Sequence, residues 1–151
     1  MNRKTLLLLA VLVLIPGVWF AISLLPEAPY KSLDNAGLEE MVRNGATIID
    51  IRRPEEWQQT GVVEGSYLIT AFDEHGRMVP DFGPRFAQVA DPTQPVVLIC
   101  RTGNRTSALS RMLVEQTDYQ DVYNVSRGIV SWIGAGKDVK PCSAPGANMQ
   151  C

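Results

Sequence analysis

The sequence predicts an α/β domain in which a mostly parallel central sheet is covered by helices on both faces. Short apolar runs of strand length alternate along the chain with segments of helical periodicity. The connections between the runs are too long for hairpins, which favours parallel pairing of the strands. One run, Val96 to Ile99, is unbroken and rich in β-branched residues, as is typical of a strand buried on both faces.

Length and charge restrict the possible functions. The chain has 151 residues, 46% of them hydrophobic, and a formal net charge of −2. This length fits one globular domain and an appendage. Because the charge is slightly acidic and Lys and Arg do not cluster, we expect no nucleic acid partner. The spacing of Cys and His matches no zinc or iron–sulfur pattern, so we expect no metal site.

The amino terminus begins with basic residues and continues as an apolar segment. Residues 6–25 carry no charge and are long enough to cross a bilayer as a helix. We therefore expect a hydrophobic N-terminal helix in the inner membrane, with the domain facing the periplasm. Cleavage near Ala21-Ile22-Ser23 is the alternative, and it would release the domain into the periplasm.

The expected organisation of the chain has three parts. A transmembrane or signal segment and its spacer occupy residues 1–27, the folded domain occupies residues 28–140, and a flexible tail occupies residues 141–151.

The first half of the domain is expected to contain two helices and a buried strand. Apolar spacing predicts a helix over residues 33–44, with Ser32 or Asp34 as its cap. The strand follows over residues 47–51. Pro54 fits a first helical position, and the short helix that it opens is expected to end at Gly61.

The second half continues this alternation. A weak strand is predicted over residues 67–70 and a helix over residues 81–90. Beyond the strand at Val96 to Ile99, a helix capped by a hydroxyl side chain is predicted to begin near Thr106. A strand over residues 122–125 and a short helix over residues 129–135 complete the domain.

The loop after the strand at Val96 to Ile99 carries a candidate nucleophile. Cys100 stands between a strand end and a helix start, where backbone N–H groups and the positive end of the helix dipole converge. Arg101 and Arg105 add positive charge, and Gly103 lets the backbone turn tightly. These features favour a thiolate at the floor of an anion site.

This loop resembles the active-site loop of the rhodanese (thiosulfate sulfurtransferase) domains, in which a cysteine carries a persulfide. Its residues are Cys100, Arg101, Thr102, Gly103, Asn104, Arg105 and Thr106. Residues 50–57 and 122–132 resemble two further signatures of the family, and the resemblance covers about residues 31 to 139. Two departures concern turns: residues 61–66 lack the common Gly-His-Ile-Pro-Gly-Ala, and Arg127-Gly128 replaces a common Gly-Gly pair.

The resemblance implies a rhodanese-like three-layer fold and a sulfurtransferase that needs no cofactor. The Cys100 thiolate would attack the outer sulfur of an anionic donor such as thiosulfate, and the resulting persulfide would pass its sulfur to cyanide or to a thiol. The rest of the loop is then expected to bind the donor, through Arg101, Thr102, Gly103, Asn104, Arg105 and Thr106.

Asp50 and Arg52 follow a buried strand and are therefore expected at the same edge of the sheet as Cys100. They are candidate supporting residues. Asp50 either orients an arginine of the loop or serves as a surface or turn-capping carboxylate. His75, the single histidine, lies among acidic residues and is expected to be solvated.

Cys142 and Cys151 lie in a segment rich in Gly, Pro, Ser and Ala. In an exported domain they can form a disulfide that closes a small loop. The alternative is a pair of free thiols that relay sulfur or reducing equivalents.

Two other functions compete with sulfur transfer. Cysteine-dependent phosphatases and arsenate reductases also place a thiolate under an anion site, but they commonly have five residues between Cys and Arg, whereas four separate Cys100 from Arg105. The smaller ring favours a sulfane sulfur over a phosphoryl group. The other competitor is a sulfur-carrying or binding module that delivers its persulfide to a dedicated membrane or periplasmic partner.

Overall fold

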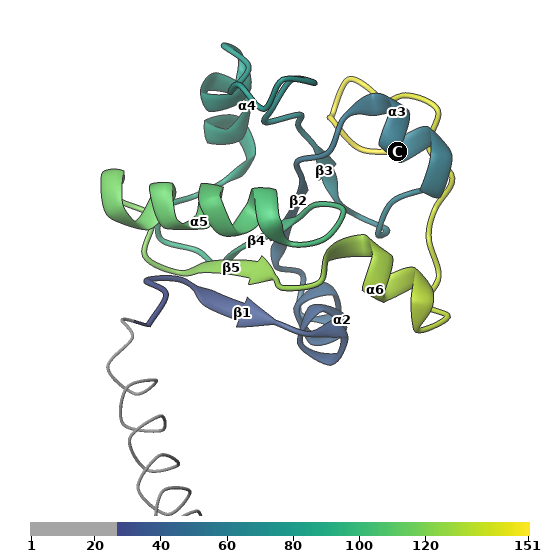
Figure 1. Cartoon of the computed structure of the whole chain (residues 1–151), viewed down its shortest axis with the longest axis horizontal. Coiled ribbons are helices and arrows are strands. Elements are labelled where there is room, and N and C mark those ends of the chain that lie inside the picture. The colour runs from purple at the N-terminus through teal and green to yellow at the C-terminus, as the bar shows by residue number, and fades with distance from the viewer. Residues whose placement is uncertain (1–26) are drawn as a thin grey trace, which may run out of the picture.

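A parallel sheet forms the centre of the computed structural model, which describes residues 27–151 (Figure 1). Its five strands are arranged in the order β1-β5-β4-β2-β3, and every neighbouring pair is parallel. The strands are β1 (Lys31–Leu33), β2 (Thr47–Asp50), β3 (Tyr67–Leu68), β4 (Val96–Ile99) and β5 (Val122–Val125). The predicted parallel α/β architecture is confirmed.

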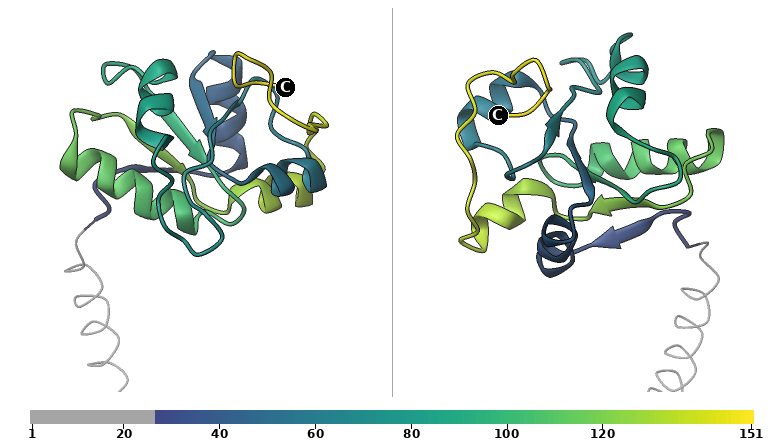
Figure 2. Two further views of the ribbon diagram at one scale, coloured as in Figure 1. Left: turned by 90° about the horizontal axis from the view of Figure 1, so that it is seen from above. Right: turned by 180° about the vertical axis from the view of Figure 1, so that it is seen from behind.

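Helices cover both faces of this sheet, as the two further views in Figure 2 show. Helices α4 and α5 pack on one face, and α2 and α6 pack on the other. The helices are α2 (Asn35–Arg43), α3 (Pro54–Thr60), α4 (Phe82–Val89), α5 (Asn104–Gln116) and α6 (Gly128–Gly134).

The central strand β4 supplies both halves of the core. Val96 and Leu98 point to the core shared with α4 and α5, whereas Val97 and Ile99 point to the core shared with α2 and α6. All four side chains are fully buried. Because successive side chains of a strand face opposite sides, a strand covered on both faces has an unbroken apolar sequence.

Two helix caps were predicted from the sequence, and the structure bears out one of them. Asp34 caps α2, since its carboxylate accepts a hydrogen bond of 2.9 Å from the N–H of Gly37. The hydroxyl cap predicted for the helix near Thr106 is wrong. That helix, α5, begins at Asn104, and its cap is Gly103 in the left-handed conformation, with no side-chain hydrogen bond.

The edge strand β1 was not predicted. Its residues, Lys31 to Leu33, are exposed or half-buried and form a strand by pairing with β5. The helix expected over residues 33–44 therefore begins two residues later, at Asn35.

Residues 141–151, assigned to a tail by the sequence, lie against α3 and β3. A disulfide joins Cys142 to Cys151, with 5.7 Å between their Cα atoms, so the structure selects the paired alternative. Cys142 is buried beside Trp57, Val62 and Leu68. The backbone N–H of Leu68, in the edge strand β3, donates a hydrogen bond of 2.7 Å to the carbonyl of Met149.

The apolar segment predicted over residues 6–25 lies outside the described residues. Among residues 27–151, no helix is both long enough and apolar enough to cross a membrane.

Candidate functional site

The backbone of Cys100 is held from two sides. Cys100 directly follows β4, and its neighbour Ile99 is in register with Asp50 of β2. Helix α6 then fixes the loop, because Ile129 donates a backbone hydrogen bond of 2.9 Å to the carbonyl of Cys100 and Val130 donates one of 3.2 Å to that of Arg101.

This approach of α6 explains the second departure from the family pattern. Gly128 has a φ of +57°, and a Cβ atom there would lie 2.4 Å from the carbonyl oxygen of Cys100. Arg127 has a φ of −115°, which accommodates a side chain. Only the second residue of the usual Gly-Gly pair is therefore required here.

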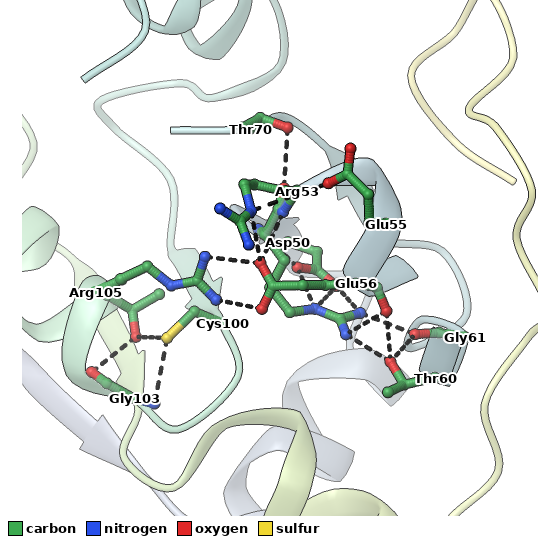
Figure 3. A network of polar contacts seen from close by, with 12 residues as sticks. Asp50, Arg53, Glu55, Glu56, Thr60, Gly61, Thr70, Cys100, Gly103 and Arg105 are labelled. Atoms are coloured by element: carbon green, nitrogen blue, oxygen red, sulfur yellow. Dashed lines mark hydrogen bonds and ion pairs between the residues drawn. The ribbon is translucent and has the colours of Figure 1, made fainter. Parts of the chain in front are cut away.

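The sulfur of Cys100 lies beneath the first turn of α5. The residue is 1% exposed. Its Sγ accepts a hydrogen bond of 3.2 Å from the N–H of Gly103 and lies 3.4 Å from the hydroxyl oxygen of Thr106 (Figure 3). The first N–H groups of a helix lack intrahelical partners and carry partial positive charge. The N-terminal end of α5 therefore stabilises negative charge on this sulfur.

Arg105 is clamped by a residue that the sequence analysis did not select. Glu56 of α3 accepts hydrogen bonds of 2.8 Å and 2.6 Å from the two terminal nitrogens of Arg105 (Figure 3). The guanidinium thus lies beside Cys100 in a fixed orientation. The pKa of Arg105 is raised, chiefly by its hydrogen bond to Glu56 and further by the charge of Cys100.

The carboxylate of Glu56 stays ionised next to this guanidinium. Burial acts to raise the pKa of Glu56, but the hydrogen bond from Arg105, the backbone N–H of Arg53 and the charges of Arg105 and Arg52 act against burial and outweigh it. The pKa of Glu56 is consequently lowered. The arginine of the loop is therefore held as half of an ion pair.

Asp50 does not orient an arginine of the loop, as one of its two expected roles required. Both of its carboxylate oxygens accept hydrogen bonds from the Arg52 side chain, the shortest at 2.6 Å, and both side chains are fully buried. Oδ1 of Asp50 also accepts the backbone N–H of Arg52 at 3.1 Å, which agrees with the turn-capping role. Arg52 also donates to the hydroxyl of Thr60 at 2.6 Å and to the carbonyl of Gly61 at 2.8 Å. This buried pair fastens α3 to the sheet and so fixes the helix that carries Glu56.

A cavity of about 660 Å³ opens above the loop. Arg101, Thr102 and Asn104 line it together with Arg105, and in the described part of the chain Arg101 forms no ion pair. Gly103 and Thr106 instead lie below, at the sulfur. The remaining lining residues are Arg53, Glu55, Glu56, Gln59, Phe72, Asp73, Glu74, Gly76 and Ala108.

His75 lies apart from the sulfur, in the loop that follows Phe72. Its side chain is 64% exposed and 3.4 Å from Glu74, in agreement with the expected solvated position.

Comparison with known proteins places these residues in a family context. The family model of the rhodanese-like domain matches residues 34–135, more than half of the chain. A tRNA uridine(34) hydroxylase of Chlamydia trachomatis is 30% identical over 103 residues, which are 66% of this chain but 30% of that protein. The chain thus spans about a third of the length of these curated relatives.

A relative closer to this chain in length is the thiosulfate sulfurtransferase GlpE of Pseudomonas syringae. It is 26% identical over 103 residues, covering 68% of this chain and 87% of that protein. Among solved structures, a rhodanese-related protein of Thermoplasma volcanium is 25% identical with a TM-score of 0.58, covering 75% of this chain and 100% of its own. The polysulfide-sulfur transferase homodimer of Wolinella succinogenes has a TM-score of 0.60 at 23% identity, with 77% and 82% covered.

Proposed function

The chain belongs to the rhodanese-like domain family, and we propose that it is a sulfurtransferase that carries sulfur as a persulfide on Cys100. The observation that carries this proposal is the buried sulfur beneath the start of α5, where the N–H of Gly103 donates to it. The resemblance to GlpE, whose name describes a thiosulfate sulfurtransferase, supports the same reaction class.

The first half-reaction forms a sulfur–sulfur bond on the enzyme. The Cys100 thiolate attacks the outer sulfur of thiosulfate, and the sulfur–sulfur bond of the donor breaks. Its electron pair leaves with sulfite, and the negative charge remains on the outer sulfur of the persulfide. The free N–H groups at the start of α5 stabilise this charge without rearrangement.

The second half-reaction returns the enzyme to its starting state. A nucleophilic acceptor, cyanide or a thiolate, attacks the outer sulfur, and the electron pair of the broken bond returns to Cys100 as a thiolate. With cyanide the product is thiocyanate. No external oxidant or reductant is needed for this cycle.

The cavity residues suit an anionic donor. Arg101 lines the cavity with its charge unpaired by the described residues. Glu56 engages two of the five N–H donors of Arg105, so three stay available. A divalent anion such as thiosulfate can therefore bind between the two guanidinium groups above Cys100.

Thiocyanate formation from thiosulfate and cyanide tests the proposal. Initial rates at several concentrations of each substrate should give the parallel double-reciprocal lines of a ping-pong mechanism. The Cys100→Ser variant should be inactive. Intersecting lines, or activity of the variant equal to that of the parent protein, would contradict the proposal.

The size of the cavity supports a second possibility, that the acceptor is a thiol of a partner protein. A volume of about 660 Å³ lies within the range of sites for ligands far larger than cyanide. A carrier of this kind would form the persulfide readily and turn over slowly with cyanide. Rapid turnover with cyanide would argue against it.

We further propose that residues 6–25 hold the domain on the exported side of the inner membrane. The uncharged run and the basic residues before it support this orientation. The disulfide between Cys142 and Cys151 also supports export, because disulfides persist in oxidising compartments. Protease added to intact spheroplasts should digest the domain, whereas full protection would place it in the cytoplasm.

A further inference from the structure

Helix α3, which carries Glu56, has a single buried side chain, that of Trp57. Trp57 is 2% exposed and packs in a small core that is separate from the two cores on the faces of the sheet. The other buried members of this core are Val62, Leu68 and Cys142, and the partly buried Cys151 packs against it. The two halves of the disulfide therefore belong to the apolar cover of Trp57.

Polar contacts join the same segment to α3 and to the loop that follows it. The side chain of Gln58 donates a hydrogen bond of 2.9 Å to the carbonyl of Ser143. Immediately before the segment, Lys140 exchanges two backbone hydrogen bonds with Val62, of 2.8 Å and 2.9 Å. Figure 1 shows residues 141–151 as a yellow loop beside α3. The C-terminal segment thus contacts this helix through apolar and polar groups alike.

Helix α3 depends on such contacts for its position. It has seven residues, too few for a helix that is stable by itself. Its orientation is fixed by the hydrogen bonds of Arg52 to Thr60 and Gly61 and by the packing of Trp57. Because the bonds of Arg52 do not involve the disulfide, loss of the disulfide should loosen α3 without releasing it.

The position of α3 reaches the site through Glu56. Its two carboxylate oxygens accept hydrogen bonds of 2.8 Å and 2.6 Å from Arg105, a bidentate pair that requires a fixed geometry (Figure 3). When α3 is loosened, the guanidinium of Arg105 samples more orientations. The donor then has to order this side chain when it binds, which costs free energy.

We propose that the disulfide between Cys142 and Cys151 is a redox-sensitive positioning device for the donor site. In the oxidised form it covers Trp57, holds α3, and thereby fixes Arg105 through Glu56. Reduction of the disulfide weakens the binding of the anionic donor. The effect on donor binding rests on the proposed function, whereas the link between the disulfide and the pair of Glu56 and Arg105 does not.

An external dithiol is the class of reductant that this device requires. One of its thiolates attacks the sulfur of Cys151, which is partly exposed, whereas Cys142 is 5% exposed. The sulfur–sulfur bond breaks, and its electron pair leaves on Cys142. The second thiol of the reductant then displaces Cys151 as its own disulfide closes, and the two cysteines end as thiols with the two protons of the dithiol.

A thermodynamic cycle on the full-length chain tests the link between the disulfide and Glu56. Urea unfolding at pH 7 compares the parent protein, Glu56→Gln, Cys142→Ser/Cys151→Ser and the combined variant. The destabilisation caused by Glu56→Gln should be at most half as large without the disulfide, because the ion pair is then already loosened. Equal destabilisation in both backgrounds would overturn the proposal. If the serine variant does not fold by circular dichroism, Cys142→Ala/Cys151→Ala replaces it with the same expectation.

Thiocyanate formation tests the consequence for the donor. The Michaelis constant for thiosulfate should rise about three- to tenfold in Cys142→Ser/Cys151→Ser. At the same time kcat should stay unchanged, because the chemistry at Cys100 is not altered. Parent protein that has been reduced with a phosphine and freed of it by gel filtration should behave like the variant. An unchanged Michaelis constant would overturn the proposal, as would an equal further rise when the disulfide is removed from Glu56→Gln.

Leu38→Ala is the control for a loss of stability alone. Leu38 is fully buried in α2, in the core that α2 shares with α6, and this core is separate from that of Trp57. The variant should lose stability through the cavity that it leaves, and its Michaelis constant should equal that of the parent protein. A rise as large as that of the disulfide variant would overturn the positioning role.

The two readouts separate this proposal from the proposed function. If the stability effects are coupled as expected but thiosulfate yields no persulfide on Cys100, the sulfurtransferase activity fails and the link between the disulfide and Glu56 stands. If the persulfide forms and the stability effects are additive, the positioning role fails alone.

Discussion

Two glycines fix the backbone around Cys100. Gly103, with a φ of +90°, brings the loop against the carbonyl of Ser126, where a Cβ atom would lie 2.1 Å from the oxygen. Gly128, with a φ of +57°, lets α6 approach the carbonyl of Cys100. Side chains at either position would push the loop away from strand β5 or from helix α6, and the geometry around the sulfur would be lost.

Gly128→Ala should therefore lower the free energy of unfolding by about 2 to 5 kcal/mol, the sum of a left-handed backbone penalty and a steric overlap. Urea unfolding measures this loss. Gly134→Ala is the control in the same helix, since a Cβ atom there meets nothing within 4 Å. Equal stability of the two variants would contradict the proposed crowding at Gly128.

Arg105→Ala should raise the Michaelis constant for thiosulfate about tenfold or more, because a charge-assisted hydrogen bond to the donor is lost. The variant also leaves the carboxylate of Glu56 without its partner in the loop, so that its negative charge repels the donor. The double variant Arg105→Ala/Glu56→Gln should therefore recover part of the loss. Steady-state kinetics distinguish these outcomes, and an unchanged Michaelis constant in Arg105→Ala would refute a role of Arg105 in donor binding.

At this scale the sequence indicated the reacting loop and the supporting pair of Asp50 and Arg52, but not the residues outside the loop that form hydrogen bonds with it. Cys100 and Arg105 stand out because they are close in the chain, between a strand and a helix. Glu56 and Arg105 are 49 positions apart, and no local pattern links them. Asn124 had one detectable signal, a polar side chain inside a short predicted strand, but its contact with Thr106 follows from the pairing of β5 beside β4.

At the scale of elements, helix α3 connects the sheet to the site. The buried ion pair of Asp50 and Arg52 fastens α3 to the sheet. Glu56, in the first turn of α3, forms an ion pair with Arg105 at the start of α5. The pair of Glu56 and Arg105 is thus the polar link between two helices that lie on either side of the cavity.

Glu56→Gln should lower stability by about 1 kcal/mol at pH 7, since a charge-assisted, partly buried pair is lost. The pKa of Glu56 is lower in the folded state than its usual 4.5. The stability that Glu56 supplies is therefore fully present above about pH 4.5, and it is lost as the pH falls through the folded pKa.

Urea unfolding of the parent protein and Glu56→Gln at pH 7 and at pH 3.5 measures the difference. The difference in the free energy of unfolding between the two proteins should be smaller at pH 3.5 than at pH 7. Glu55→Gln is the neighbouring control, because the Glu55 side chain is 69% exposed and should show little difference at either pH. A difference between parent and Glu56→Gln that does not change with pH would contradict the assigned ion pair.

The predictability of the elements follows their burial. Strands β4 and β5 and helix α4 were predicted within one or two residues, because apolar periodicity records which faces are covered. The sequence of strand β1 shows no apolar periodicity, since its side chains are largely exposed. It is a strand because it pairs with β5. The start of α5 was misplaced because a left-handed glycine, rather than a hydroxyl side chain, begins that helix.

For the whole molecule, the C-terminal segment closes the edge of the sheet at β3. The carbonyl of Met149 accepts from Leu68, and the side chain of Gln58 in α3 donates a hydrogen bond of 2.9 Å to the carbonyl of Ser143. The disulfide between Cys142 and Cys151 ties this segment into a loop over Trp57. The segment thus braces the same helix that carries Glu56.

Removal of this disulfide in Cys142→Ser/Cys151→Ser should lower the free energy of unfolding by about 2 to 3 kcal/mol, as the chain-entropy model gives for a loop of this length. Thermal unfolding with and without a phosphine reductant measures the effect. The parent protein should lose stability on reduction, whereas the double variant should not respond. Equal melting temperatures of the reduced and oxidised parent protein would mean that the segment does not brace the domain.

The central claim is that Cys100 carries a transferable sulfur atom. The intact mass of the full-length chain, taken after incubation with thiosulfate and removal of the donor, tests it most directly. We predict a gain of one sulfur atom that is absent in Cys100→Ser and that disappears when cyanide is added. An unchanged mass in folded protein whose Cys100 still reacts with iodoacetamide would contradict the claim.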